Sequence, residues 1–367
     1  MRVLLISMRS EASSGSPKAA GVRLPAERAP VQPSLLGPDA PAGAGAPGCG
    51  AERHVPRPLA GRRAVPVDGV TCLEVRARTA IDRVPEAEGL PYRWGVSPYR
   101  GCAIGCAHCA ARPGHRHLGL DPMREFATHV VVKTDVADRL RRELAAPRWQ
   151  GEAVAVGITG DCYQPVEEAY RLMPRVIRAF ADAGNPFTVL TKSPLVLRDL
   201  DLLREAAQVT RVEVLVSVGF VDDRIRRVVE PGAVTPQRRL EVCAALNEAG
   251  IPCGVVMTPI LPLITDSTDH LQATVRRAAE AGAVSVIPVV LRLPTPVREW
   301  YLGWLEREHP GLLPRYRALY AHGPLADAAY RERVAAHVRA LAEMYGIGRS
   351  ARRWRRRRSP ARQLALV

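Results

Sequence analysis

The stretch Gly101-Cys102-Ala103-Ile104-Gly105-Cys106-Ala107-His108-Cys109 holds three cysteines in the spacing C-x3-C-x2-C. Thiolates are preferred ligands of soft metals and of iron–sulfur clusters, and such a site needs several of them within a few ångströms. Gly101 and Gly105 allow the tight backbone turns that would point all three sulfurs inward. A closed site uses four ligands, so three thiols predict a metal centre with one open position for a reactant.

These three cysteines have two other interpretations. Positions i, i+4 and i+7 share one face of a helix, so the thiols could form a buried stripe, although the glycines and Pro98 disfavour a helix here. Zinc could combine the three thiols with His108, His115 or His117. Structural zinc sites usually take their ligands as two separated pairs, and no second CxxC or HxxxH motif follows.

The chain around this loop resembles the radical SAM superfamily, in which SAM is S-adenosylmethionine. It is similar above all to the spore photoproduct lyase-like branch, and within that branch to an uncharacterised actinobacterial group. The resemblance extends from about Val67 to Gly348. The sequence words that carry it, besides the cysteines, are Pro98-Tyr99-Arg100-Gly101-Cys102, His117-Leu118-Gly119-Leu120-Asp121, Val131-Val132-Lys133, Gly160-Asp161-Cys162-Tyr163-Gln164, Leu190-Thr191-Lys192-Ser193 and Glu230-Pro231.

The resemblance implies a [4Fe–4S] cluster held by Cys102, Cys106 and Cys109, with SAM on the fourth iron. One electron then cleaves SAM to a 5′-deoxyadenosyl radical, which abstracts hydrogen from a substrate. The implied electron donor is a reductant such as a flavodoxin or a ferredoxin. The substrate cannot be read from the residues; a DNA lesion, as in spore photoproduct lyase, is the candidate that the branch suggests.

Five residues at the ends of predicted strands are expected to bind the cofactor. Lys192 is expected to pair with the SAM carboxylate, because it carries a point charge on a flexible stem. Ser217 is expected to contact the ribose or the methionyl group, and Ser193 to belong to the same site. Asp161 and Tyr163 are expected to position SAM or substrate.

Two further residues are candidates for roles close to the cluster. His108 stands where the family commonly has an aromatic residue that contacts the adenine, so it is expected to do the same. Cys162 is a candidate hydrogen donor to a substrate radical, although an ordinary thiol at the rim of the site is the simpler interpretation. The family usually has Tyr or Phe where this chain has Ala110, so one stacking surface is missing.

Apolar strands alternate with amphipathic helices after the cysteine loop, and this pattern predicts a parallel sheet covered by helices. We expect the α/β class and a partial (β/α)6 TIM-like barrel, with its reacting groups at the carboxyl ends of the strands. The expected strands lead through Tyr92 to Val96 and then lie at 153–158, 187–190, 212–217, 253–257 and 284–291; a segment at 70–81 packs on the barrel.

The predicted domains are a disordered N-terminal extension (1–65), the radical SAM barrel (66–293), a C-terminal helical extension (294–346) and an Arg-rich disordered tail (347–367). The first segment is rich in Ala, Gly, Pro and Ser, which cannot bury enough apolar surface to fold. The net charge of +15 comprises +5 in residues 1–65 and +8 in residues 346–367. The body is therefore almost neutral, which gives no sign of a nucleic-acid-binding surface there.

Composition also bears on the compartment and on a second function. No run of about 18 apolar residues occurs, so we expect no membrane span. Eight cysteines in 367 residues do not indicate a disulfide scaffold, and we expect a cytoplasmic protein. The alternative function is a zinc-containing, non-redox nucleic-acid-binding protein, suggested by His108 and by the arginines around Trp354, which could contact phosphates and a base.

Overall fold

Seven strands form the main sheet of the computed structural model, which describes residues 63–84 and 92–348. Six of them run parallel, and each belongs to a successive strand–helix unit. The strand order is β11-β10-β9-β8-β7-β4-β3, with β3 antiparallel at the edge. The strands are β3 (Ile81–Arg83), β4 (Trp94–Val96), β7 (Val154–Val156), β8 (Phe187–Thr191), β9 (Val212–Ser217), β10 (Cys253–Ile260) and β11 (Val286–Val290). This open sheet confirms the predicted α/β class and the six units of a partial barrel.

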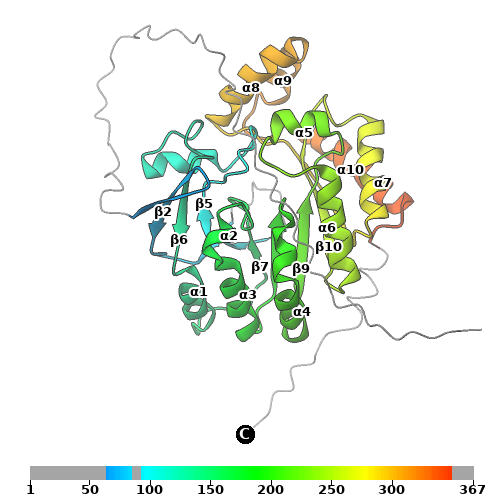
Figure 1. The fold of residues 1–367 in the computed structure, drawn as a ribbon. Helices are drawn as coiled ribbons and strands as arrows, with labels where there is room; N and C mark the ends of the chain where they lie inside the picture. The colour runs from blue at the N-terminus through cyan, green and yellow to red at the C-terminus, as the bar shows by residue number, and fades with distance from the viewer. Residues whose placement is uncertain (1–62, 85–91, 349–367) are drawn as a thin grey trace, which may run out of the picture. The chain divides into compact units, whose positions relative to one another are not determined.

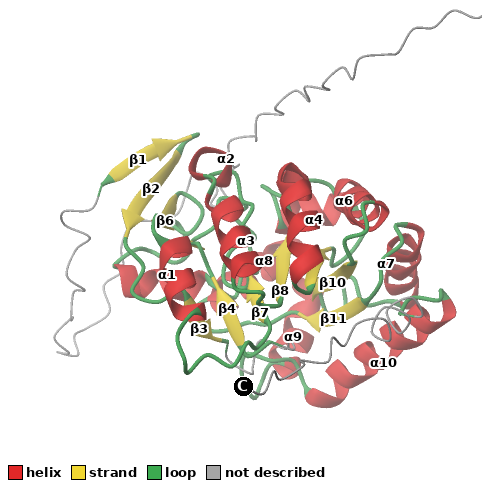
Figure 2. Ribbon diagram, turned by 90° about the horizontal axis from the view of Figure 1, so that it is seen from below, coloured by secondary structure: helices red, strands yellow, loops and turns green. Residues whose placement is uncertain are grey.

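The strands carry apolar side chains on both faces of the sheet. Helices cover one face, and the other face borders the cavity. Residues such as Val154 and Val189 pack into the large core under the helices, whereas Leu190, Leu215 and Val256 form a separate cluster on the opposite face. Figure 2 shows the helices in an arc outside the strands. They are α1 (Val136–Leu144), α3 (Leu172–Asp182), α4 (Leu200–Val209), α6 (Pro236–Glu248) and α7 (Thr268–Glu280).

Helices follow the strands as the alternation predicts. The helical segment after β7 is split into α2 (Glu167–Tyr170) and α3, because Arg171 between them takes a left-handed φ of 48°. A 3-10 helix, η3 (Pro194–Asp199), precedes α4. Asp135 directly precedes α1, but its carboxylate accepts a hydrogen bond from Ala77 N (2.7 Å) and does not cap the helix.

A second sheet holds the entrance to the cysteine loop. Its order is β1 (Ala64–Val67), β2 (Val70–Val75), β6 (His129–Lys133) and β5 (Tyr99–Arg100). The segment expected at 70–81 thus contributes β2 to this sheet and only its last residue to β3. The extension that was predicted to be disordered through residue 65 overlaps β1, which begins at Ala64. Residues 1–62 of that extension lie outside the described residues.

Three helices follow the last strand, as predicted: α8 (Val297–Glu308), α9 (Leu313–Leu319) and α10 (Ala328–Met344), with η4 (Pro310–Leu312) after α8. In Figure 1, α8 and α9 lie above the ends of the strands. Tyr316 donates a hydrogen bond to Pro262 O and Tyr320 donates one to Leu291 O, both at 2.6 Å, so α9 is fixed to the loops after β10 and β11. No helix in the described residues has the length and apolar content to cross a bilayer. The Arg-rich tail falls beyond residue 348 and is not described.

Candidate functional site

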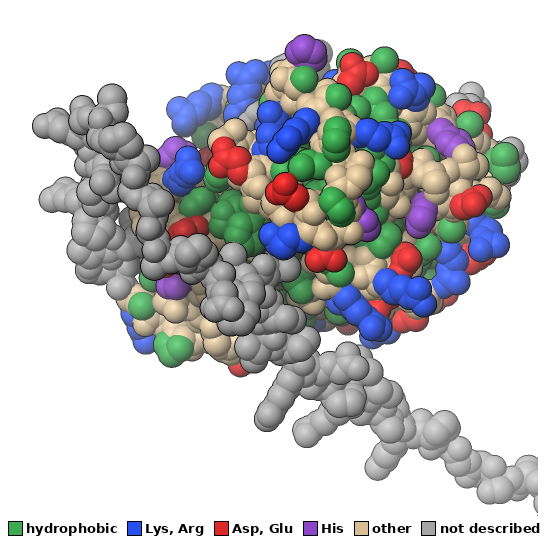
Figure 3. All heavy atoms as spheres, turned by 90° about the horizontal axis from the view of Figure 1, so that it is seen from above, with side chains coloured by type: hydrophobic (Ala, Val, Ile, Leu, Met, Phe, Trp, Pro, Cys, Tyr) green, Lys and Arg blue, Asp and Glu red, His purple; other side chains and the backbone are tan. Residues whose placement is uncertain are grey.

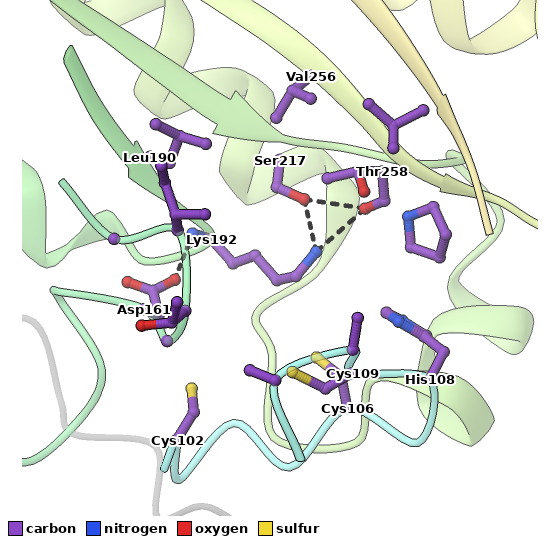
Figure 4. A pocket seen from close by; sticks show the side chains of 18 of the residues that line it. Cys102, Cys106, His108, Cys109, Asp161, Leu190, Lys192, Ser217, Val256 and Thr258 are labelled. Atoms are coloured by element: carbon purple, nitrogen blue, oxygen red, sulfur yellow. Dashed lines mark hydrogen bonds between the residues drawn. The ribbon is translucent and has the colours of Figure 1, made fainter. Parts of the chain in front are cut away.

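A cavity of about 230 Å³ lies where the parallel strands end, and all three cysteines of the motif line it. The carboxyl ends of β8, β9 and β10, and the segments that follow β7, β8 and β11, supply most of the other polar side chains. Figure 4 shows the sulfurs of Cys102, Cys106 and Cys109 directed into this space, with Lys192 extended above them. The polar lining residues beyond the cysteines include His108, Asp161, Lys192, Ser217, Thr258 and Arg292.

The cysteine loop consists of two consecutive turns. Gly105 N donates to Cys102 O at 3.1 Å and Cys109 N donates to Cys106 O at 3.3 Å. Gly101 has a φ of 86°, and a Cβ built there would lie 2.7 Å from His129 O, so only glycine fits. The interpretation as a buried helical stripe was therefore wrong, because this backbone does not continue as a helix.

Two neighbouring segments hold the loop in place. The Gln164 side chain, which follows β7, accepts from Ala103 N (2.9 Å) and donates to Gly101 O (3.1 Å). On the other side, Gly232 N donates to Ile104 O at 3.1 Å, and a Cβ on Gly232 would lie 2.7 Å from the same oxygen. The backbones at Gly232 and Ile104 therefore approach as closely as glycine allows, and the first half of the motif is held from two sides.

The chemistry of the three thiols fits an iron–sulfur cluster. None of the three forms a disulfide with another described cysteine, and Cys102 and Cys106 are buried. Burial, with the Asp161 carboxylate nearby, raises the pKa of Cys102 to about 12. Burial likewise raises the pKa of Cys106 well above its ordinary value. Metal ligation requires thiolates, so cluster binding here would release the protons that the thiols otherwise keep.

Asp161 joins the loops that follow β7 and β8. Its carboxylate accepts hydrogen bonds from Thr191 Oγ1 (2.7 Å), Tyr163 N (2.8 Å) and Lys192 N (2.6 Å). Burial raises the pKa of Asp161, and these donors oppose that rise. The residue lines the cavity, as predicted, and its bonds also set the position from which the Lys192 side chain starts.

The Lys192 ammonium sits in a cage of oxygen atoms. It donates to Ser217 Oγ (2.5 Å) and Thr258 O (3.3 Å), and it lies 2.9 Å from Glu230 Oε1. Ser217 and Lys192 were both predicted site residues, and they come together here. The Glu230 carboxylate was quoted in a sequence word but was given no role, and its position beside Lys192 is new information from the structure.

Glu230 is the centre of a buried charge network. Its Oε2 lies 2.6 Å from Arg239 Nη2, and its Oε1 lies 3.4 Å from His108 Nε2. Burial alone would raise the pKa of Glu230, but Arg239 and Lys192 outweigh it and hold the pKa well below the usual range. Burial lowers the pKa of His108. At neutral pH, Glu230 is therefore an anion that fixes two cations.

The three histidines that could complete a zinc site differ in burial and in whether they line the cavity. His115 is buried, with Nε2 3.0 Å from His129 O and its ring against Phe126, and His117 is exposed. Neither lines the cavity. Ligand atoms of Cys106, His108 and Glu230 do lie within 4.8 Å of one another. Two cations already neutralise Glu230, however, and their charges oppose a zinc ion at that point.

Three predicted site residues do not line the cavity. Cys162 is fully buried, and its thiol points to the carbonyl oxygens of Leu190 (3.6 Å) and Val156. Tyr163 is also buried and donates from its hydroxyl to Asp199 Oδ2 (3.0 Å). Ser193 Oγ accepts from Leu195 N and caps η3. After β7 the chain turns so that Asp161 faces the cavity and Cys162 faces back toward the strands.

Comparisons with known proteins agree with this geometry. The model of the Radical SAM superfamily matches residues 96–278. Uncharacterized proteins of Mycobacterium bovis (Mb2609c) and Mycobacterium tuberculosis strain H37Rv (Rv2578c) are each 44% identical over 285 residues, which is 78% of this chain and 84% of theirs. A radical SAM Nalpha-GlyT isomerase of Pseudomonas phage M6 is 24% identical, over 58% of this chain and 42% of that protein.

Solved structures share the fold. A spore photoproduct lyase mutant has a TM-score of 0.57 at 14% identity, over 76% of this chain and 80% of its own. A second mutant, with bound AdoMet and dinucleoside spore photoproduct, has a TM-score of 0.56 at 15% identity, over 75% and 79%. The family uses a [4Fe–4S] cluster and SAM. The chain belongs to the radical SAM superfamily, as its cysteine loop, its six parallel strands and these matches together show.

Proposed function

We propose that this radical SAM enzyme holds its [4Fe–4S] cluster through Cys102, Cys106 and Cys109 and binds SAM in the adjoining cavity. The observation that carries the proposal is the meeting of three thiols from one loop with Asp161, Lys192 and Ser217 in a single cavity. When bound, the cluster supplies one electron for SAM cleavage, and SAM supplies the adenosyl group that abstracts hydrogen from substrate.

Lys192 would bind the SAM carboxylate. Its ammonium is already directed over the cysteines by Ser217, Thr258 and Glu230, so little side-chain freedom remains to be lost on binding. Ser217 would then lie within reach of the methionyl or ribose part of the same ligand.

His108 would provide a flat surface for the adenine at the edge of the cavity. It lines the cavity next to Ala110, whose small side chain leaves the neighbouring space open. The remaining wall is largely apolar and includes Leu190, Val256 and Val290. Such a wall excludes water, and this protects a reactive intermediate from side reactions.

The electron would come from an external protein such as a flavodoxin or a ferredoxin, since the family requires a reductant.

DNA as substrate or partner stays a prediction. On the face seen in Figure 3, Lys and Arg side chains lie interspersed with Asp and Glu, apart from what the grey atoms cover. The buried position of the Cys162 thiol argues against a hydrogen-returning cysteine at that residue. We therefore propose hydrogen abstraction from a substrate whose class stays open.

Iron analysis of anaerobically reconstituted protein tests the assignment of the cysteines. We expect about four irons per chain and a broad absorbance near about 400 nm that dithionite bleaches. Cys102→Ala, Cys106→Ala and Cys109→Ala should each lose most of this iron. Cys72→Ala, which removes a buried thiol outside the cavity, should keep it. A colourless wild-type protein with one zinc would support the alternative function and contradict this one.

A further inference from the structure

Arg112 folds back beneath the cysteine loop and is 4% exposed. It begins the 3-10 helix η2 (Arg112–Leu118), three residues after Cys109. Its guanidinium donates to Cys106 O from both Nε (3.0 Å) and Nη2 (2.9 Å), and to Gly105 O from Nη2 (3.0 Å). Nη1 donates to Met123 O (2.9 Å) and Pro122 O (3.3 Å). One side chain therefore ties the middle of the motif to the segment that follows η2.

This buried charge has no close anionic partner in the described chain. Every hydrogen-bond acceptor of Arg112 is a neutral backbone carbonyl, and within the described ranges no carboxylate lies at ion-pair distance from it. The Phe126 ring, 5.0 Å from the guanidinium carbon, gives a cation–π contact. A buried charge without a counter-charge is costly, even when it donates five hydrogen bonds to neutral carbonyls.

The guanidinium lies beside the motif, because two of its nitrogens donate to the carbonyl oxygen of Cys106. Burial lowers the pKa of Arg112, and the thiols of Cys109, Cys106 and Cys102 oppose that change. Each becomes a thiolate when it ligates metal. Arg112 would thus acquire its counter-charge only when a cluster is bound, and this differs from the arginines in the ion pairs elsewhere in the chain.

We propose that Arg112 is a positioning residue for the cluster, with two effects that rest on the proposed function. Its fork of hydrogen bonds holds the loop in the shape that accepts the cluster. Its permanent positive charge stabilises the reduced cluster, because the one electron delivered by the external reductant adds a negative charge in a low-dielectric site.

The two effects can be separated by substitution. Arg112→Met removes both the charge and the fork, whereas Arg112→Lys keeps the charge and loses the fork, because an ammonium cannot reproduce the planar set of donors. Arg116→Met is the matched control, since Arg116 is an exposed arginine on the same 3-10 helix. Iron per chain and the midpoint potential, from a dithionite titration followed by electron paramagnetic resonance without SAM, are the two readouts.

We expect Arg112→Met to make cluster reduction at least tenfold less favourable, which is a potential about 59 mV lower for one electron. Arg112→Lys should keep a potential near that of the wild type but hold less than half of its iron. Arg116→Met should match the wild type in both readouts. If Arg112→Met holds too little iron to titrate, which supports the positioning role, Arg112→Gln tests the charge, because it removes the charge and keeps an amide donor; its potential should also fall by about 59 mV.

The inference is overturned if Arg112→Met shows wild-type iron content and potential, or if Arg116→Met shifts the potential equally. The inference is also overturned if Arg112→Lys lowers the potential by about 59 mV or more, which is a tenfold change in the reduction equilibrium. It is overturned as well if Arg112→Lys retains all of the wild-type iron. A wild-type protein that binds no iron would refute the proposed function itself. If the wild type binds iron and the Arg112 variants give one of the contrary results above, only this inference is refuted.

Discussion

The Lys192 ammonium lies 2.9 Å from the Glu230 carboxylate, although the two residues belong to different strand–helix units. Glu230 in turn is anchored by Arg239, whose side chain is 1% exposed. The cation that we assign to the SAM carboxylate is therefore positioned before any ligand binds. A charged group that is already in place loses little freedom on binding, which favours affinity.

Replacing Lys192 by Met should weaken SAM binding by about tenfold or more, since a hydrogen bond to a charged group contributes about 1.5–3 kcal/mol. Equilibrium dialysis of labelled SAM against the reconstituted protein measures this. Ser193→Ala is the control, because Ser193 caps η3 and does not line the cavity. Equal SAM affinities for the two variants would show that Lys192 has no such role.

Replacing Glu230 by Gln should lower the free energy of unfolding by about 3 kcal/mol at pH 7, because it leaves the buried Arg239 charge without its partner. The folded-state pKa of Glu230 is depressed, so its contribution is fully present above the unfolded pKa of about 4.5 and is lost as the pH falls toward the folded value. The gap between wild type and variant should therefore narrow by about 1.4 kcal/mol per pH unit below that point. Urea titrations at pH 7 and below pH 4 measure it, and a gap that stays constant would contradict the assignment.

The fold and the metal ligands could be predicted because they depend on local patterns. Strands such as β7 and β8 are runs of apolar and β-branched residues, and the cysteine spacing carries its own chemistry. Glu230 could not be assigned a role, because only the packing of α5 (Asp223–Val229) against the cysteine loop brings it to Lys192. Likewise, an arginine in a basic stretch is expected to be solvated, yet Arg112 is buried.

Replacing Gly101 by Ala should reduce cluster loading by more than half, because the new Cβ would meet His129 O and His115 Cε1 and the backbone has a positive φ. Gly114→Ala is the matched control on η2, where a Cβ meets nothing within 4 Å. Iron per chain after identical reconstitution is the measurement. The strain assigned to the loop would be disproved by wild-type loading in the Gly101 variant.

Replacing Cys162 by Ala should leave SAM cleavage within about twofold of the wild type and cost about 1 kcal/mol of stability, because the thiol is a buried group packed near the strands. The rate of 5′-deoxyadenosine formation and a urea titration measure the two effects. A large loss of turnover with unchanged stability would restore Cys162 as a reacting group.

The position of Cys162 outside the cavity lining has a physical origin. Polar words at strand ends predict which residues lie near the cavity, but not which of them face it. Gly157, with a φ of 95°, begins the turn after β7, and a Cβ there would lie 2.4 Å from Leu190 O. This backbone geometry directs Asp161 into the cavity and leaves Cys162 and Tyr163 behind it. The residue type alone does not show whether a side chain points into the cavity or away from it.

The most direct test of the central claim is reductive SAM cleavage by the reconstituted protein. With SAM and dithionite under anaerobic conditions, chromatography should detect 5′-deoxyadenosine from the wild type and from Cys72→Ala, and only background from Cys102→Ala, Cys106→Ala and Cys109→Ala. Wild-type protein that carries the full complement of iron but forms no 5′-deoxyadenosine, or a motif variant that forms as much as the wild type, would contradict the account.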